Sequence, residues 1–348
     1  MTARPEAGMP SGRSGDLLVG VDVGGSKIAA LVVDSGLAVR GRTTVPTPVG
    51  APDHAAERIA SAIRAALADA GASLDRVSAV GVGVPGRVDP VAGVVSLAVN
   101  LDWHRLPLRD RLQVEMGVPC GIENDVRAAA AGTLDRGLLG DVADFVFLGV
   151  GTGISAGVVL GGRVHRGIRG LAGEVGHVVV DADGARCPCG LRGCLEAIAA
   201  GPAVARAASE ALAAGRGSSL AAEAEVDAVA VYRAATAGDD LALEVVGRAG
   251  RALARAIHAL VMTYDVERVV LGGGVSGAGA AFAGPILAEL AAMRAASELA
   301  AEMLPEDFVA ISPDGPDAGV WGGVSIARRL ATAADDRSEE VVARQATA

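Results

Sequence analysis

The stretch LLVGVDVGGSKIAALVV, residues 17–33, decides the fold. Two apolar runs, 17–23 and 28–33, flank the turn Gly24-Gly25-Ser26-Lys27. Two runs of strand-forming residues joined by a short glycine turn are typical of a β-hairpin. Glycine lets the backbone approach a ligand closely, and backbone N–H groups that converge on one spot bind phosphate well. Asp22 stands near the end of the first run, just ahead of the turn, where its carboxylate could hold Mg²⁺ through water.

The chain repeats this layout in FVFLGVGTGISAGVVL, residues 145–160. Residues 149–153 line up with 22–26, which indicates a duplicated supersecondary unit and therefore two related lobes. A third turn, Gly272-Gly273-Gly274, follows the predicted strand 268–271. None of the three turns fits the Walker pattern or G-x-G-x-x-G, so each alone is explained as a simple hairpin turn. The three together, with the Thr152 hydroxyl, favour a phosphate site.

Strands and helices alternate along the rest of the chain. Ile59, Ile63 and Leu67 recur at a spacing of four, which predicts a helix on 54–70. The other predicted helices are 106–116, 125–136 and 241–264, and the other predicted strands are 77–84 and 119–122. The predicted organisation is a flexible leader on 1–15, an N-terminal lobe on 16–137, a C-terminal lobe on 138–334 and a frayed tail on 335–348.

Composition excludes several classes of protein. The formal net charge is −10 and the pI is near 5.1, so the chain repels a phosphate backbone and nucleic acid is not an expected partner. No uninterrupted apolar run reaches the roughly 18 residues of a membrane span, so no membrane partner is expected. Residues 1–15 lack the apolar core of a signal peptide, and the expected location is cytoplasmic.

Three of the four cysteines cluster in RCPCGLRGCLE. In a reducing compartment, Cys187, Cys189 and Cys194 are better explained by metal binding than by disulfides, although three free thiols remain the alternative. His177, ten residues earlier, can complete a tetrahedral Zn²⁺ site. Four protein ligands leave no open position, so the zinc would be structural. Cys120 stands alone and is expected to be a small buried hydrophobe.

Longer segments resemble the ROK family of bacterial sugar kinases and repressors. LAGEVGHVVVDADGARCPCGLRGCLEA, residues 171–197, is similar to the family signature, Gly-Glu-x-Gly-His followed by Cys-x-Cys-Gly-x-x-Gly-Cys-Leu-Glu. GIENDVRAAA, residues 121–130, resembles the family's Glu-Asn-Asp catalytic element, and the three glycine turns resemble its phosphate and adenosine motifs. The resemblance covers about residues 17–330 and implies an α/β, two-lobed, actin-like and hexokinase-like ATPase fold with a cleft between the lobes.

The resemblance also implies an activity, the ATP-dependent phosphorylation of a hexose hydroxyl, with glucose and ATP as the small-molecule partners and Mg²⁺ and structural Zn²⁺ as metals. Asp125 matches the catalytic base. The positions that match sugar-binding residues are Asn100, Asn124, Asp125, Glu174, His177 and Glu196. The zinc ligands match His177, Cys187, Cys189 and Cys194. The expected nucleotide-binding residues are Asp22, Gly24, Gly25, Ser26, Lys27, Gly151, Thr152, Gly153, Gly272, Gly273 and Gly274. A homo-oligomer, dimer or tetramer, is expected on the same ground.

The chemistry is consistent with these assignments. A carboxylate within reach of the attacking hydroxyl can accept its proton, and Asp125 at a helix start is held in its ionised form. The alternative is that Asn124 and Asp125 only cap the helix. His177 could bind zinc through one ring nitrogen and a sugar hydroxyl through the other.

Two segments depart from the family's pattern. Arg127 stands where the family often has Asn, and Ser155-Ala156 stands where the second turn is usually richer in glycine. Both departures weaken the assignment of glucose over another hexose. The alternatives are a kinase of N-acetylmannosamine, fructose or kanosamine, and a non-catalytic sugar sensor. A repressor is disfavoured because only about sixteen residues precede the first strand, too few for a helix-turn-helix domain.

Overall fold

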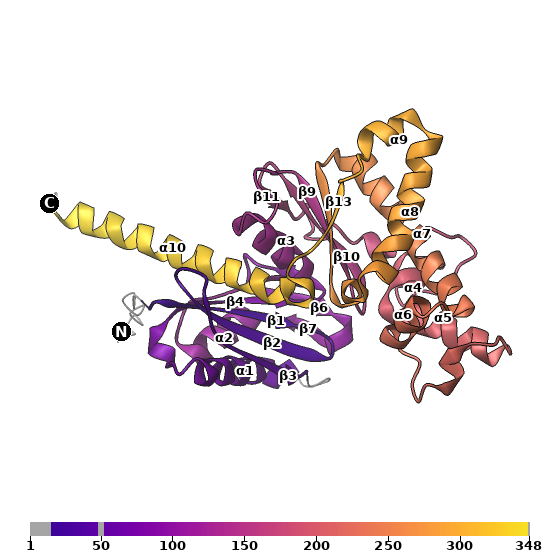
Figure 1. The fold of residues 1–348 in the computed structure, drawn as a ribbon. Helices are drawn as coiled ribbons and strands as arrows, with labels where there is room; N and C mark the ends of the chain where they lie inside the picture. Colours follow the sequence, from indigo (N-terminus) through magenta and orange to yellow (C-terminus); the bar gives the residue numbers. More distant parts are fainter. Residues whose placement is uncertain (1–14, 48–51, 347–348) are drawn as a thin grey trace. The chain divides into compact units, whose positions relative to one another are not determined.

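The computed structural model describes residues 15–47 and 52–346, with side chains described as far as residue 333 (Figure 1). The predicted leader, 1–15, therefore lies almost wholly outside the described residues. The chain forms two compact units. Unit 1 contains the chain up to Asp125 and again from Val320 onward, and unit 2 is Val126–Gly319.

Unit 1 is built on a five-stranded sheet in the order β3-β2-β1-β4-β8. The predicted hairpin is confirmed, since β1 and β2 pair antiparallel from Leu17↔Asp34 to Val23↔Ile28. β4 is parallel to β1, and β8 is parallel to β4. These strands are β1 (Leu17–Val23), β2 (Lys27–Asp34), β3 (Val39–Pro46), β4 (Val77–Val84) and β8 (Cys120–Asn124).

Helices cover both faces of this sheet. On one face lie α1 (Ala55–Asp69) and α2 (Leu108–Met116), and the predicted stripe of α1 is fully buried there. On the other face, α10 (Ala318–Ala346) packs through Val320 and Val324. The helix lies almost on the strand backbone, because a Cβ at Gly81 would come within 2.1 Å of the Gly323 carbonyl oxygen. Only glycine permits so close an approach.

A small antiparallel sheet, β5-β6-β7, is inserted between β4 and β8 and was not predicted. Its strands are β5 (Arg87–Asp89), β6 (Val94–Ala98) and β7 (Trp103–Leu106). The 3₁₀ turn η3 (Val99–Leu101) joins β6 to β7. The remaining short helices of unit 1 are η1 (Pro52–His54) and η2 (Leu74–Arg76).

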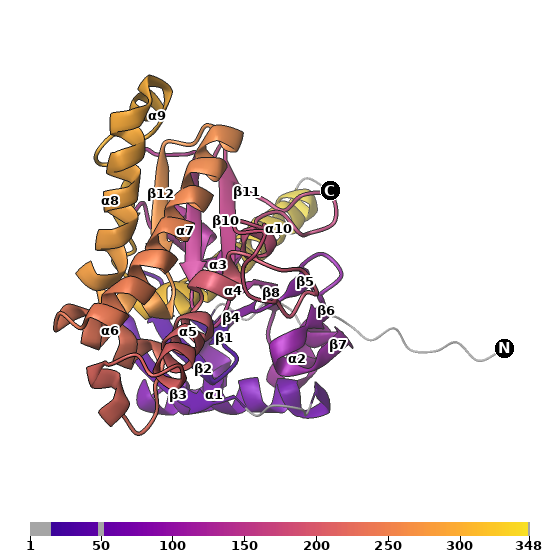
Figure 2. The same cartoon turned by 90° about the vertical axis from the view of Figure 1, so that its right-hand side faces the viewer.

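Unit 2 repeats the strand order of unit 1. Its sheet runs β11-β10-β9-β12-β13, with an antiparallel trio followed by two parallel strands, so the predicted duplication is confirmed by topology. The strands are β9 (Phe145–Val150), β10 (Ile154–Leu160), β11 (Arg163–His165), β12 (Arg268–Gly272) and β13 (Val309–Ile311). The helices α5 to α8 gather on one side of this sheet (Figure 2), and α3 packs on the other.

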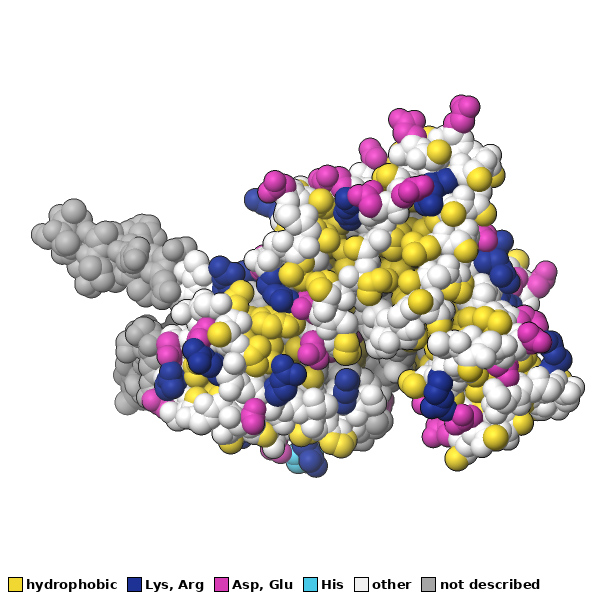
Figure 3. All heavy atoms as spheres, in the orientation of Figure 1, with side chains coloured by type: hydrophobic (Ala, Val, Ile, Leu, Met, Phe, Trp, Pro, Cys, Tyr) yellow, Lys and Arg dark blue, Asp and Glu magenta, His cyan; other side chains and the backbone are white. Residues whose placement is uncertain are grey.

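The helices of unit 2 are mostly alanine-rich. They are α3 (Asp125–Asp135), α4 (Glu196–Ala199), α5 (Gly201–Ala213), α6 (Ala228–Thr236), α7 (Asp240–Tyr264), α8 (Ala280–Ala296) and α9 (Glu298–Met303). The 3₁₀ turns are η4 (Val175–His177), η5 (Ser219–Ala222), η6 (Gly274–Ala278) and η7 (Gly315–Asp317). On the face that Figure 3 shows, acidic side chains gather over α9.

The division between the units differs from the predicted contiguous lobes, 16–137 and 138–334. The chain leaves the first sheet at β8 and then places α3 on the second sheet, against Phe145 and Phe147. It leaves the second sheet at β13 and returns α10 to the first. Each sheet is thus completed by a helix that follows the other sheet's last strand.

The C-terminal segment is helical, and the length and apolar character of the helices bear on whether any of them could span a membrane. α10 continues as far as Ala346, through most of the segment that was expected to be frayed. Within the described residues, none of the helices combines the length and the apolar character needed to cross a membrane.

Candidate active site and metal centre

The candidate site residues fall into two groups, one in each unit. Unit 1 carries Asp22, Gly24, Gly25, Ser26, Lys27, Asn100, Asn124 and Asp125. Unit 2 carries Gly151, Thr152, Gly153, Glu174, His177, Cys187, Cys189, Cys194, Glu196, Gly272, Gly273 and Gly274.

The first glycine turn is closed by backbone and side-chain bonds within unit 1. The Gly24 N–H donates to the Lys27 carbonyl at 2.8 Å, and the Thr47 hydroxyl donates to the Gly24 carbonyl at 2.8 Å. Ser26 and Lys27 remain exposed at its tip. A Cβ at Gly25 would lie 3.8 Å from the Cβ of Asn100, which sits in η3. The structure therefore brings the predicted sugar-loop asparagine beside the first phosphate turn.

Asp125 lies at the junction of β8 and α3. The Asn124 side-chain amide donates to the Asp125 Oδ1 at 2.9 Å and to the Gly86 carbonyl at 3.2 Å. The backbone N–H of Asn124 donates to the carboxylate of buried Glu123 at 2.9 Å. The carboxylate of Asp125 is thus oriented by its neighbour and placed in the first turn of a helix, where the helix dipole favours its ionised form.

Sequence reasoning missed the supporting roles of Glu123 and Gly86. Glu123 belongs to the Glu-Asn-Asp element, so the motif itself was the available signal. Gly86 follows the predicted strand end at Pro85, and nothing local to that turn indicates a contact with a residue 38 positions away.

The second and third glycine turns meet at one edge of the unit 2 sheet. β9 and β12 are parallel, with Gly149 opposite Gly272, so the turns that follow them emerge side by side. A Cβ at Gly151 would lie 3.9 Å from the Gly274 nitrogen. Gly273 has φ 85°, and a Cβ there would come within 2.4 Å of the Val150 carbonyl oxygen, so glycine is required. Thr152 is exposed at the tip of the second turn.

Glu196 connects this edge to the segment that carries the sugar signature. Its Oε2 accepts the Ile154 N–H at 2.9 Å, directly after the second turn. A Cβ at Gly153 would lie 2.6 Å from the same oxygen. Glu196 therefore has one oxygen occupied by the turn, a constraint that the sequence did not reveal.

Glu174 is half-buried at the start of η4. Burial raises the pKa of its carboxyl above the usual value, and the nearby negative charge of Glu196 adds to that rise. The nearby side chains of His177 and Arg127 oppose it. Glu174, His177 and Glu196 therefore lie close enough to influence one another, and a common sugar site remains a prediction.

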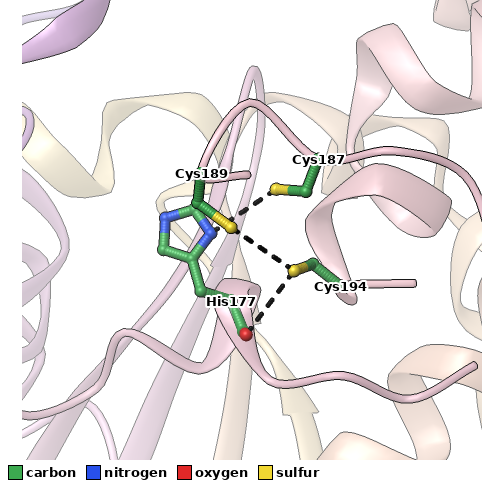
Figure 4. Close-up of side chains that lie close together, drawn as sticks. All are labelled: His177, Cys187, Cys189 and Cys194. Atoms are coloured by element: carbon green, nitrogen blue, oxygen red, sulfur yellow. Dashed lines mark hydrogen bonds between the residues drawn. The ribbon is translucent and has the colours of Figure 1, made fainter. Parts of the chain in front are cut away.

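The metal cluster is assembled as expected (Figure 4). The ligand atoms of His177, Cys187, Cys189 and Cys194 all lie within 4.8 Å of one another. The Cys187 Sγ is 3.7 Å from the His177 Nδ1, and the Cys189 Sγ is 3.6 Å from the Cys194 Sγ. Ligand atoms around tetrahedral Zn²⁺ lie about 3.5–3.8 Å apart, as bond lengths of about 2.0–2.3 Å require. The residues present fit a structural zinc ion.

The loop that holds the thiols is shaped by its own backbone. The Cys187 N–H donates to the Leu191 carbonyl at 2.8 Å, and the Gly190 N–H donates to the Cys187 carbonyl at 3.0 Å. Burial raises the pKa of Cys187 and raises that of Cys194 to about 12, whereas the Leu191 backbone lowers the pKa of Cys189. Buried thiols become thiolates when a metal cation is bound. Cys120 is buried in β8, and burial raises its pKa to about 12, as expected of a small core residue.

Comparisons with known proteins agree with this geometry. The family model described as the ROK family matches residues 18–329. A glucokinase of Halalkalibacterium halodurans is 34% identical over 276 residues, covering 77% of this chain and 83% of that protein. An N-acetylmannosamine kinase of Citrobacter koseri is 36% identical over 262 residues, covering 73% of this chain and 82% of that protein.

A solved structure is similar over nearly the whole chain. The crystal structure of a ROK family glucokinase from Streptomyces griseus, in complex with glucose and AMPPNP, superposes with a TM-score of 0.76 at 33% identity. The match covers 90% of this chain and 99% of that one. The predicted α/β fold of the actin-like, hexokinase-like class is confirmed.

Proposed function

The chain belongs to the ROK family and is a hexose kinase. From this premise we propose that it transfers the γ-phosphoryl group of ATP to glucose, giving glucose 6-phosphate. The observation that carries the proposal is the Asp125 carboxylate, held by the Asn124 amide at 2.9 Å at the start of α3. Phosphoryl transfer depends on positioning and on neutralising charge, and the acceptor hydroxyl needs a nearby base.

In this mechanism Asp125 accepts the proton of the attacking hydroxyl. Asn100, Asn124, Glu174, His177 and Glu196 hold the other sugar hydroxyls, and the three glycine turns cradle the nucleotide with their backbone N–H groups. Mg²⁺ would be held through water near Asp22 and would neutralise the phosphate charge.

Zinc has a structural role in the proposal. His177, Cys187, Cys189 and Cys194 would hold it, and it would fix the loop that leads into Glu196. Because His177 is exposed, its second ring nitrogen can face a sugar hydroxyl while Nδ1 is directed to the metal. The family resemblance also favours a homo-oligomer, which light scattering on the purified protein would measure.

The test is ADP release in the presence of Mg²⁺ across glucose, mannose, N-acetylmannosamine, fructose and kanosamine. The proposal predicts the highest kcat/KM with glucose. ADP release with none of the sugars would overturn kinase function. The second candidate is N-acetylmannosamine, which the 36% identical relative favours, and a higher kcat/KM with that sugar would replace glucose as the substrate.

A further inference from the structure

Residues 170–174, here called the acceptor turn, lead directly into η4 and end at Glu174. The turn has no regular secondary structure of its own, so its position depends on what holds it. Two elements of unit 2 do so, α3 through a side chain and β10 through its backbone and a side chain.

From α3, the turn is held by Arg127. Its side chain is almost fully buried, at 1% exposure, and Nη1 donates to the Gly170 carbonyl at 3.0 Å. Burying a guanidinium is costly unless its donors are used, and a hydrogen bond from a charged donor is stronger than a neutral one. The place of the Gly170 carbonyl is therefore specified by α3.

From β10, the turn is held through the Gly173 carbonyl. That oxygen accepts the Ala156 N–H at 2.7 Å and the Ser155 hydroxyl at 3.3 Å. Gly173 has φ 91°, and a Cβ there would lie 1.8 Å from the Ala156 carbonyl oxygen. The turn thus lies directly on the strand, in a backbone conformation that requires glycine.

We propose that Arg127 and Ser155 are positioning residues that fix the acceptor turn and thereby place the Glu174 carboxylate for binding the hexose. The inference rests on the proposed function, in which Glu174 accepts a sugar hydroxyl. The two positions that depart from the ROK pattern hold the same five-residue turn from opposite ends. This chain therefore sets its sugar affinity through contacts at Gly170 and Gly173.

Steady-state kinetics with glucose test the proposal. Arg127→Met keeps an unbranched but shorter side chain and removes the donors, and it should raise the glucose KM about 10-fold or more, the usual effect of losing a charge-assisted hydrogen bond. The KM for ATP and the kcat should change less than about 3-fold if the contact of Arg127 with Gly170 is the one that matters for the sugar. Ser155→Ala should raise the glucose KM only about 2- to 3-fold, since its 3.3 Å bond is long.

Two controls separate positioning from general structure. Thr133→Val removes a buried side-chain bond to the Ala129 carbonyl on the same helix and should leave the glucose KM unchanged. In a double-mutant cycle, Arg127→Met should add little to the glucose KM of Glu174→Gln, because both act through one carboxylate. Additive effects would show that Arg127 does not act through Glu174 and would overturn the proposal.

Hydrogen exchange provides a readout independent of activity. Amides of residues 168–176 should exchange faster in Arg127→Met and in Ser155→Ala than in the wild type or Thr133→Val. If Arg127→Met does not fold, Ser155→Ala carries the same measurement. Unchanged exchange in this segment overturns the inference even where wild-type kinase activity is present. If the wild type has no kinase activity and the variants still exchange faster in this segment, the proposed function is rejected and the positioning contacts stand.

Discussion

The sheets of the two units share one strand order but carry different insertions. In unit 1 the segment between β4 and β8 adds the small β5-β6-β7 sheet and the loop of Asn100. In unit 2 the segment between β11 and α7 adds the loop of Cys187, Cys189 and Cys194, together with Glu174 and Glu196. The repeated part supplies a glycine turn after a strand in each unit. The inserted parts supply most of the groups proposed to recognise sugar, and Asn124 and Asp125 at the β8–α3 junction supply the others.

The junction that follows the unit 1 sheet gives the largest expected effect. Asp125→Asn keeps the size of the side chain and its place at the start of α3, and removes the proton acceptor. We expect kcat to fall about 10²–10⁴-fold, the usual contribution of a positioned acid–base group, with little change in the glucose Kd. Asp110→Asn, in the first turn of α2, is the matched control. Turnover above about half of wild type would remove Asp125 from the mechanism.

If the proposed zinc ion is bound, the structure of the unit 2 insertion should depend on it, unlike that of unit 1. Cys187→Ser should reduce bound zinc from one ion per chain to nearly none, because a tetrahedral site needs all four ligands. The loss should also raise the glucose KM and lower Tm, although a large core can survive without the metal. Metal analysis and thermal unfolding measure both effects. The control variant Cys120→Ala should bind as much zinc as the wild type. A wild-type protein without zinc would contradict the proposed metal site.

The glycine turns should differ in how well they tolerate an alanine substitution. Gly273→Ala places a Cβ within 2.4 Å of a backbone oxygen at φ 85°, so we expect a loss of about 2 kcal/mol or more in the free energy of unfolding. Gly25→Ala meets nothing closer than 3.8 Å and should cost less than about 0.5 kcal/mol. Denaturant unfolding measures the difference. Equal losses in the free energy of unfolding would show that close backbone packing does not distinguish the two turns.

The smallest effect on kinetics is expected at Glu196, which links the unit 2 insertion to the second glycine turn. Glu196→Gln keeps one oxygen that can accept the Ile154 N–H but loses the charge, so the KM values for glucose and ATP should both rise only about 2- to 5-fold. Glu210→Gln, an exposed position on α5, should leave both values unchanged. A rise confined to glucose would show that Glu196 does not support the nucleotide turn.

Local patterns were sufficient for much of this structure. The hairpin at 17–33, its repeat at 145–160 and the stripe of Ile59, Ile63 and Leu67 follow from residue spacing, because each forms its contacts within one element or one turn. The metal cluster also follows from spacing, since three of its four ligands lie in one short loop.

Contacts distant in sequence were not predictable in the same way. The return of α10 to the first sheet depends on Gly20 and Gly81 meeting a helix about 240–300 residues later, and no local periodicity encodes that approach. The bond from Ile154 to Glu196 spans 42 residues, and the Arg127 contact with Gly170 spans 43. These long-range contacts fix the site, and only the three-dimensional structure shows them.

The central claim is that this chain phosphorylates the 6-hydroxyl of glucose. The most direct measurement incubates the wild-type protein with ATP, Mg²⁺ and either glucose or 6-deoxyglucose, and follows ADP and glucose 6-phosphate together. We predict one glucose 6-phosphate for each ADP with glucose, and no sugar-dependent ADP release with 6-deoxyglucose. ADP formed without glucose 6-phosphate, or equal turnover of 6-deoxyglucose, would contradict the account.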